Sequence, residues 1–174
     1  MSLSNARIQV EGCVYSDDAH AICVLGRVLL TYSLAQPNAA YLQSWTGVVG
    51  KLEAPILVLT VIDSRARAPD AASKAAIAQT ITRNQHKIGA FCYVIEGDGF
   101  AGAAMRSALS LISLGTRYPF PQRVTATARE AAPWLIKHLP PEQQALQEAS
   151  RVVRSVDLAR EALTRGRAKS LQQR

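Results

Sequence analysis

Cysteine is scarce in this 174-residue chain, and its spacing excludes two common ways of stabilising a small protein. The three cysteines, Cys13, Cys23 and Cys92, form an odd set without a Cys-x-x-Cys pair. This pattern predicts neither a disulfide framework nor a zinc site. A hairpin turning at Asp18 would bring Cys13 and Cys23 opposite each other, a pair that air can oxidise but that we expect to stay reduced in a cytosol.

Long apolar segments are also lacking. The longest apolar stretch, residues 54–62, is far shorter than the roughly 20 residues that cross a bilayer, and the first residues lack the apolar core of a signal peptide. We therefore expect a cytoplasmic protein that does not insert into membranes. Aromatic residues are few, and Phe91 with Tyr93 is too small a set for a surface that stacks nucleic-acid bases.

No catalytic or metal-binding arrangement is visible among the reactive side chains. His20, His86 and His138 are scattered, and no nucleophile or carboxylate lies at a spacing that would assemble a triad or a metal site with them. The net charge of +7 is spread along the chain, which is more typical of solubility than of nucleic-acid recognition. We expect a non-enzymatic protein without a metal or cofactor.

The residues that are present predict one folded domain. Hydrophobic residues make up 48% of the chain and charged residues 19%, a composition typical of globular proteins. The expected strands cover residues 7–15, 21–28, 55–62, 90–95 and 123–126, and the expected helices begin near residues 37, 69, 100, 127 and 140. This order predicts an α/β domain over residues 1–139, with helices on a mixed, partly parallel sheet of about five strands. A basic amphipathic helix over residues 140–174 follows it.

Three local patterns carry most of this prediction. Residues 55–62 form a continuous apolar run, as expected for a strand covered by helices on both faces. Ile77, Ile81 and Ile88 form an apolar stripe among alanines, which indicates a helix ending near Gly89. Thr127 and Glu130 match the capping box that opens a helix.

Two of the expected helices carry more apolar surface than a lone domain needs. The helix over residues 100–114 is apolar around most of its circumference, and the last helix has apolar residues at 3-4-7 spacing, interrupted by Arg160. The last helix is expected to dock on its own domain or on a partner, and the excess apolar surface of the two helices favours contact with a protein partner or a second copy of the chain. The predicted interaction surface consists of Phe100, Met105, Leu109, Ile112, Val153, Val156 and Leu163.

The order of elements, β-β-α-β-α-β-α-β-α, resembles that of the STAS domain, the fold of anti-sigma-factor antagonists and of the cytoplasmic tails of sulfate transporters. The resemblance covers roughly residues 7–139. Its most similar pieces are the strand over residues 55–63 with its helix, and the segment 123–135, which is similar to the last strand and helix of such domains. The segment 94–100 is similar to STAS-like bacterial proteins of no assigned function. The resemblance implies a regulatory or scaffolding role through protein binding.

STAS domains that act as switches carry Asp-Ser-Ser-Gly at a helix start, where a kinase phosphorylates a serine. Only Asp63 and Ser64 match this motif here, because Arg65 and Ala66 replace the second serine and the glycine. Alignment on the helix start instead places Ser73 nearest the phosphorylated position. The resemblance therefore implies Ser64 or Ser73 as candidate phosphorylation sites, and an ordinary loop or helix serine is the alternative reading of each.

Two further segments are candidate binding sites. Gly97, Gly99 and Gly102 form a G-x-G-x-x-G motif between a strand and a helix, where amide groups can hold a phosphate. Glycines that only permit a tight turn between strand and helix are the better account of the motif. Asp63, Ser64, Arg65 and Arg67 gather at the carboxyl end of a central strand, where α/β sheets often bind ligands. This loop can receive a small anion or an acidic partner, or its charges can satisfy one another.

Three functions remain open from the sequence. The first is a STAS-like module that acts by protein–protein interaction. The second is a carrier of a small apolar ligand or lipid, held beside the sheet. The third is an enzyme or nucleotide-binding protein that uses the turn from Gly97 to Gly102 to hold a phosphorylated molecule.

Overall fold

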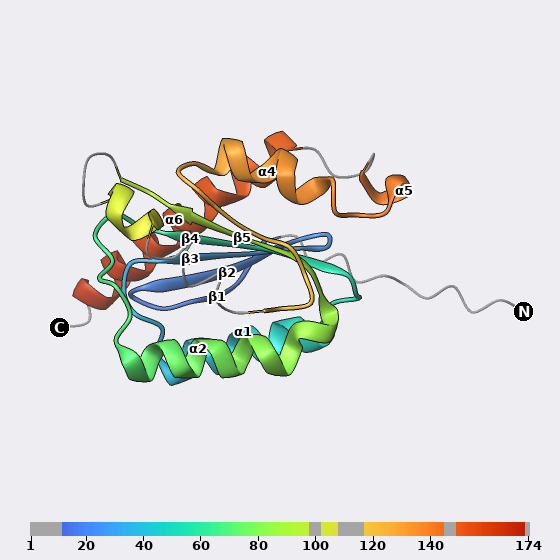
Figure 1. Ribbon diagram of the computed structural model, residues 1–174. Helices are drawn as coiled ribbons and strands as arrows, with labels where there is room; N and C mark the ends of the chain where they lie inside the picture. The colour runs from blue at the N-terminus through green and yellow to red at the C-terminus, as the bar shows by residue number, and fades with distance from the viewer. Residues whose placement is uncertain (1–11, 98–101, 108–116, 145–148, 173–174) are drawn as a thin grey trace, which may run out of the picture.

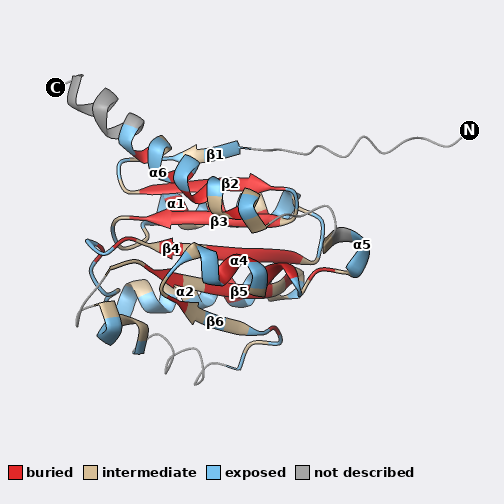
Figure 2. Cartoon of the chain, turned by 90° about the horizontal axis from the view of Figure 1, so that it is seen from above, coloured by how far each residue is buried: buried red, intermediate tan, exposed pale blue. Residues whose placement is uncertain are grey.

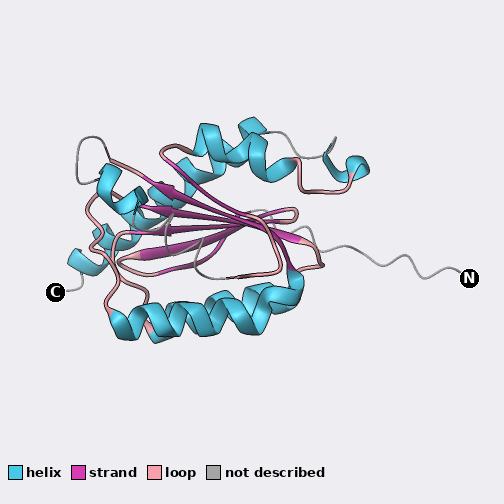
Figure 3. Cartoon of the chain, in the orientation of Figure 1, coloured by secondary structure: helices cyan, strands magenta, loops and turns pink. Residues whose placement is uncertain are grey.

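A twisted mixed sheet forms the centre of the molecule, with helices on both of its faces (Figures 1 and 3). The computed structural model describes residues 12–97, 102–107, 117–144 and 149–172. The strands are β1 (Gly12–Ser16), β2 (His20–Leu25), β3 (Val28–Ser33), β4 (Ile56–Ile62), β5 (Ile88–Ile95) and β6 (Gln122–Thr125). The helices are α1 (Ala39–Lys51), α2 (Ala71–Asn84), α4 (Ala128–Ile136), α5 (Pro141–Gln144) and α6 (Ala149–Gln172). Residues 102–107 are also helical.

The strands lie in the order β1-β2-β3-β4-β5-β6 within the described part of the chain. The first three are antiparallel neighbours, and β3 to β6 are parallel. This arrangement confirms the predicted α/β class, the mixed and partly parallel sheet, and the additional C-terminal helix. The apolar run over residues 55–62 is β4, and every residue of its neighbour β3 is buried (Figure 2).

The sheet has one strand more than the sequence predicted. The segment taken as a single strand over residues 21–28 is divided by Gly26, whose φ of 56° favours glycine, so that the chain reverses and β3 follows β2. Ile88, predicted to end the stripe of the second helix, is instead the first residue of β5. Helix α2 ends earlier than predicted, at Asn84, and a 3₁₀ turn, Gln85–Lys87, connects it to the strand.

Side-chain capping explains where the helices begin. The Asn38 side chain accepts a hydrogen bond from the amide of Tyr41 (2.8 Å), and Asp70 accepts one from the amide of Ser73 (2.7 Å). The predicted capping residue Thr127 opens α4 by accepting from the amide of Glu130 at 3.3 Å. These bonds satisfy amides that the first helical turn leaves without a partner.

Helix α6 packs against the molecule's own sheet. It contacts β1, β2, β3 and α4, and Val156 and Leu163 are 3% and 2% exposed in the core on this face. This corrects the prediction that these two residues belong to an interaction surface, because the sheet already covers them. Val153 is partly buried against the same core. Phe100, Leu109 and Ile112 lie outside the described residues.

A disulfide joins Cys13 to Cys23, directly opposite each other across β1 and β2. The predicted placement of these two cysteines opposite each other in a hairpin is confirmed, whereas the structure joins them in place of the reduced pair that we expected. The count and spacing of the cysteines alone had indicated no disulfide framework, because they do not show which residues become cross-strand neighbours. Cys92 is free and buried on β5, within the segment 90–95 that the sequence predicted as a strand.

Candidate functional site: an apolar pocket beside the sheet

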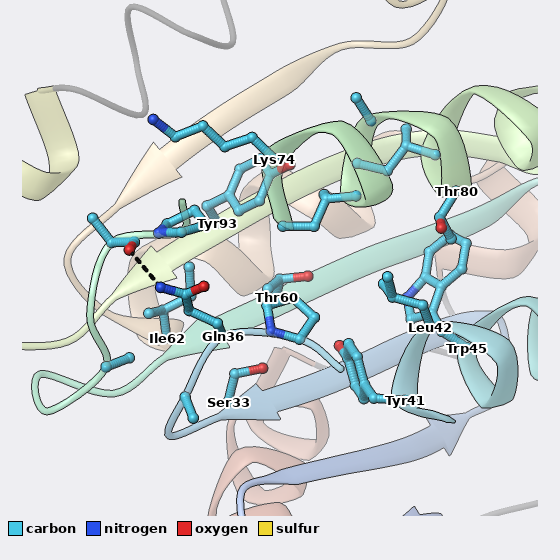
Figure 4. Close-up of a pocket in the computed structure, with 18 of the residues that line it drawn as sticks. Ser33, Gln36, Tyr41, Leu42, Trp45, Thr60, Ile62, Lys74, Thr80 and Tyr93 are labelled. Atoms are coloured by element: carbon cyan, nitrogen blue, oxygen red, sulfur yellow. Dashed lines mark hydrogen bonds between the residues drawn. The ribbon is translucent and has the colours of Figure 1, made fainter. Parts of the chain in front are cut away.

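A cavity of about 530 Å³ lies between the sheet and the helices α1 and α2 (Figure 4). Strands β3, β4 and β5 contribute Ser33, Thr60 and Tyr93 to its wall, and apolar side chains make up most of the rest. Leu42, Trp45, Ile77, Ile81 and Phe91 are among these apolar residues. A volume of this size falls within the range of roughly 300 to 1,000 Å³ that small-molecule sites occupy.

Small side chains line the cavity on α2. Ala75 and Ala78 both belong to its wall and are themselves exposed to solvent. A larger side chain at either position would take up part of the space beside the helix. The sequence shows these alanines beside Ile77 and Ile81, but it does not show that they face a cavity.

The polar groups in the pocket wall are few and mostly satisfied. Thr31, on β3, donates a hydrogen bond from its hydroxyl to that of Thr60 at 3.0 Å. Burial raises the pKa of Tyr41 and of Tyr93, so both phenols keep their protons at neutral pH. The tyrosine hydroxyl groups of this cavity are therefore neutral and set in a mainly apolar wall.

Gln36 closes the side of the pocket at the carboxyl edge of the sheet. Its amide nitrogen donates to the carbonyl of Ala68 (3.1 Å), and its amide oxygen accepts from the Ser73 hydroxyl (2.9 Å). Gln36 thereby links the segment before α1 to the segment that opens α2. Arg67 and Lys74 also line the cavity at this end (Figure 4 shows Lys74).

A separate polar cluster lies at the ends of β3, β4 and β5. The Tyr32 hydroxyl lies within hydrogen-bond distance of Asp63 (2.9 Å) and of Glu96 (2.8 Å). Arg65 donates to both oxygens of Asp63, at 2.7 and 2.9 Å, and Arg160 of α6 donates to Glu96 at 2.7 Å. A smaller cavity of about 220 Å³ adjoins this cluster and is lined in part by Tyr32, Arg65 and Arg160.

The residues of the predicted anion-binding loop belong to two different sites in the structure. Asp63 and Arg65 form a bidentate pair, so the charges of this part of the loop satisfy each other. The Arg65 side chain is the main cause that holds the pKa of Asp63 well below its usual range. Ser64 is exposed, whereas Arg67 belongs to the large pocket. The two candidate phosphorylation sites also differ in their surroundings: Ser64 is exposed, whereas the Ser73 hydroxyl donates a hydrogen bond to the side chain of Gln36.

Close packing explains two of the three glycines in the G-x-G-x-x-G motif. Gly97 has a φ of 118°, and a Cβ on Gly102 would lie 2.4 Å from the carbonyl oxygen of Gly97. Only glycine fits such an approach. Arg106 donates to the carbonyls of Ile95 and Gly97, both at 3.1 Å, which holds the turn against the end of β5. Gly99 lies outside the described residues.

The three histidines stay apart. His20 is buried beside Tyr41, and its ring nitrogens lie 3.1 Å from Asp17 and from the carbonyl oxygen of Gln36. His86 is in the 3₁₀ turn after α2, and His138 contacts Trp134 after α4. Within the described residues, no group of three or more His, Cys, Asp or Glu side chains is placed to hold a metal ion.

The sequence offered only a faint signal for the pocket. Arg67 and Met105 were singled out for other reasons, as part of an anion loop and of an interaction surface, and both line the cavity. Thr60 is a polar residue inside the apolar run of β4, and it lies in the pocket wall. Polar interruptions of a buried strand are therefore the signal that could have pointed to this site.

No protein-family model matches this chain, and neither the curated proteins nor the solved structures contain a significant match to it. Among the described helices, none combines the length and the apolar character needed to pass through a lipid bilayer. The geometry of the pocket is thus the main basis for a functional proposal.

Proposed function

We propose that this chain is a STAS-like module that binds a small, mainly apolar molecule between its sheet and the helices α1 and α2. The observation that supports the proposal is the cavity of about 530 Å³, lined mostly by apolar side chains. A concave site of this volume with a mainly apolar wall and a few polar groups is the usual form of a small-molecule binding site.

A role in binding a protein partner, first among the functions expected from the sequence, has less support. The apolar face of α6 is covered by the protein's own sheet. Among the described residues, the large hydrophobic side chains that are exposed are Val14 and Leu158, at 42% and 45%. These residues are on β1 and α6. Two exposed side chains are ordinary on the surface of a globular protein and are fewer than a docking patch needs.

Filling the cavity tests the proposal. The substitution Ala78→Leu adds volume at the pocket wall, whereas Ala72→Leu adds the same side chain on α2 at a position that does not line the pocket; both alanines are exposed, so the two variants differ in the pocket and not in exposure. A neutral fluorescent probe such as Nile red should bind the unaltered protein and the Ala72→Leu variant. Its affinity for Ala78→Leu should fall by about tenfold or more, because the volume it needs is occupied.

Native mass spectrometry of the purified chain provides a second readout. A small molecule that co-purifies with the unaltered protein, and is lost in the Ala78→Leu variant, supports the proposal. Equal probe affinity in all three proteins, with circular dichroism showing that each is folded, contradicts it.

A further inference from the structure

The charged residues that line the pocket are all of one sign. Arg67 and Lys74 are the cationic residues of the lining, and no aspartate or glutamate occurs among the lining residues that the structure describes. Arg67 follows β4, and Lys74 is in the first turns of α2, so both lie near the carboxyl edge of the sheet. The pocket therefore has a positively charged end.

The other end of the pocket is apolar. Helix α1 runs from this edge over the sheet toward Trp45, and α2 runs alongside it toward Ile81. Phe91, near the start of β5, completes this part of the lining. In Figure 4, Gln36 and Lys74 lie at one side of the cavity and Trp45 at the other. Charge and apolar surface are thus separated along the length of the cavity.

Arg67 and Lys74 are more available to an external anion than the other cations at this edge of the sheet. Arg65 is committed to Asp63, and Arg160 to Glu96. Lys74 lies near Asp70, whose carboxylate accepts a hydrogen bond from the amide of Ser73 at the start of α2. Both Arg67 and Lys74 are exposed on one side and line the pocket on the other.

We propose that the ligand of this pocket is an amphipathic anion, with an acid group beside Lys74 and Arg67 and an apolar body extending toward Trp45. This inference rests on the proposed function, because it assigns a chemical class to the molecule that the cavity holds. An apolar body gains free energy by leaving water, and a carboxylate at the charged end keeps contact with solvent and with two cations. A cationic head group would be repelled at the same place.

Three probes with the same alkyl chain separate the contributions of charge and apolar contact. Decanoate, decanol and decyltrimethylammonium differ in the charge of the head group. Trp45 lines the pocket, and Trp134 is on α4 at the opposite face of the sheet, so a Trp134→Phe variant makes Trp45 the reporter of binding. Isothermal titration calorimetry checks the affinities measured by fluorescence. Decanoate should bind most tightly and decyltrimethylammonium least tightly.

Charge removal at the pocket then tests the assignment of the head group. Lys74→Gln and Arg67→Gln should each weaken decanoate binding by about three- to fivefold, as expected for partly solvated ion pairs, and leave decanol binding unchanged. Lys74→Arg should retain the affinity for decanoate. Arg83→Gln is the matched control, because Arg83 is exposed on the same helix and does not line the cavity.

The possible results distinguish this inference from the proposed function. If decanol binds as tightly as decanoate, or if Lys74→Gln weakens both equally, the anionic class is wrong while the apolar pocket stands. If none of the three probes binds, both proposals fail.

Discussion

The guanidinium of Arg160 on α6 donates a hydrogen bond of 2.7 Å to Glu96 at the end of β5, 64 residues earlier in the chain. The same group lies 5.3 Å from the centre of the Tyr32 ring, and its Nε is 3.3 Å from the Tyr32 hydroxyl. Tyr32 in turn lies within hydrogen-bond distance of both Asp63 and Glu96. Arg160, which interrupts the apolar spacing of the last helix, thus connects that helix to the polar edge of the sheet.

Replacing Arg160 should loosen this connection. In Arg160→Met, Glu96 and Asp63 keep the buried Tyr32 hydroxyl between them but lose one of the cations that balance their charge. The free energy of unfolding should fall by about 1 kcal/mol, a value kept small because Arg160 is partly exposed. Urea denaturation measures it. Arg154→Met, an exposed position on the same helix, should change stability little, and equal losses in the two variants would contradict the role of Arg160.

Stability should decline in acid because two carboxylates have lowered pKa values. Arg65 holds the pKa of Asp63 well below its usual range. For Asp17, burial opposes ionisation, but hydrogen bonds from the Ala19 amide, Tyr15 and His20 outweigh it and bring the pKa to about 2. Such groups contribute stability above the pKa of the unfolded chain, about 4, and lose it as the pH falls through the folded pKa.

Unfolding in urea at pH 5, 4 and 3 checks this expectation. The free energy of unfolding should fall across this window, and the fall should be shallower in Asp63→Asn, which has no charge to lose at that position. A variant with the same slope as the unaltered protein would show that Asp63 does not contribute.

Lys87 should stabilise the end of α1. Its ammonium group donates to the carbonyls of Val49 (3.1 Å), Gly50 (2.8 Å) and Leu52 (3.0 Å), which surround the end of that helix. Lys87→Met should lower the free energy of unfolding by about 1 to 2 kcal/mol. Lys51, exposed in the last turn of α1, is the control for charge alone, and a similar loss in Lys51→Met would argue against specific capping by Lys87.

The disulfide makes stability depend on reductant. It closes a short loop, with a sequence separation of 10 residues, so reduction should lower the free energy of unfolding by about 2 kcal/mol. A Cys13→Ser variant should show the lower stability with or without dithiothreitol. Sensitivity to reductant that persists in this variant would assign the effect to something other than the disulfide.

Thiol reactivity gives an independent measure of the same bond. Burial raises the pKa of Cys92 to about 11, so this thiol should react slowly with a disulfide reagent in the native protein. After mild reduction, a fast-reacting thiol should appear, because Cys13 is exposed on β1. A fast-reacting thiol in the native protein before reduction would contradict this assignment.

The sequence by itself determined the elements whose signals are local. The apolar run of β4 and the capping box at Thr127 act within a few residues, and each predicted its strand or helix. The alternation of strands and helices then determined the α/β class, because parallel strands need crossover connections. Two local features were missed at this level: the two-residue turn at Gly26 that divides one apolar run, and the end of α2 before Ile88.

The tertiary structure decided which surfaces are covered and where space remains. Val156 and Leu163 could have faced a partner until α6 was seen to pack on the protein's own sheet. The wall of the pocket brings together residues of α1 and α2 with strand residues that come from other parts of the chain. A cavity depends on how side chains from segments distant in sequence fill the space between them, and an ion pair such as Arg160 with Glu96 also joins two distant segments. The periodicity of one segment shows which of its faces is apolar, but it does not show which other segment packs against that face.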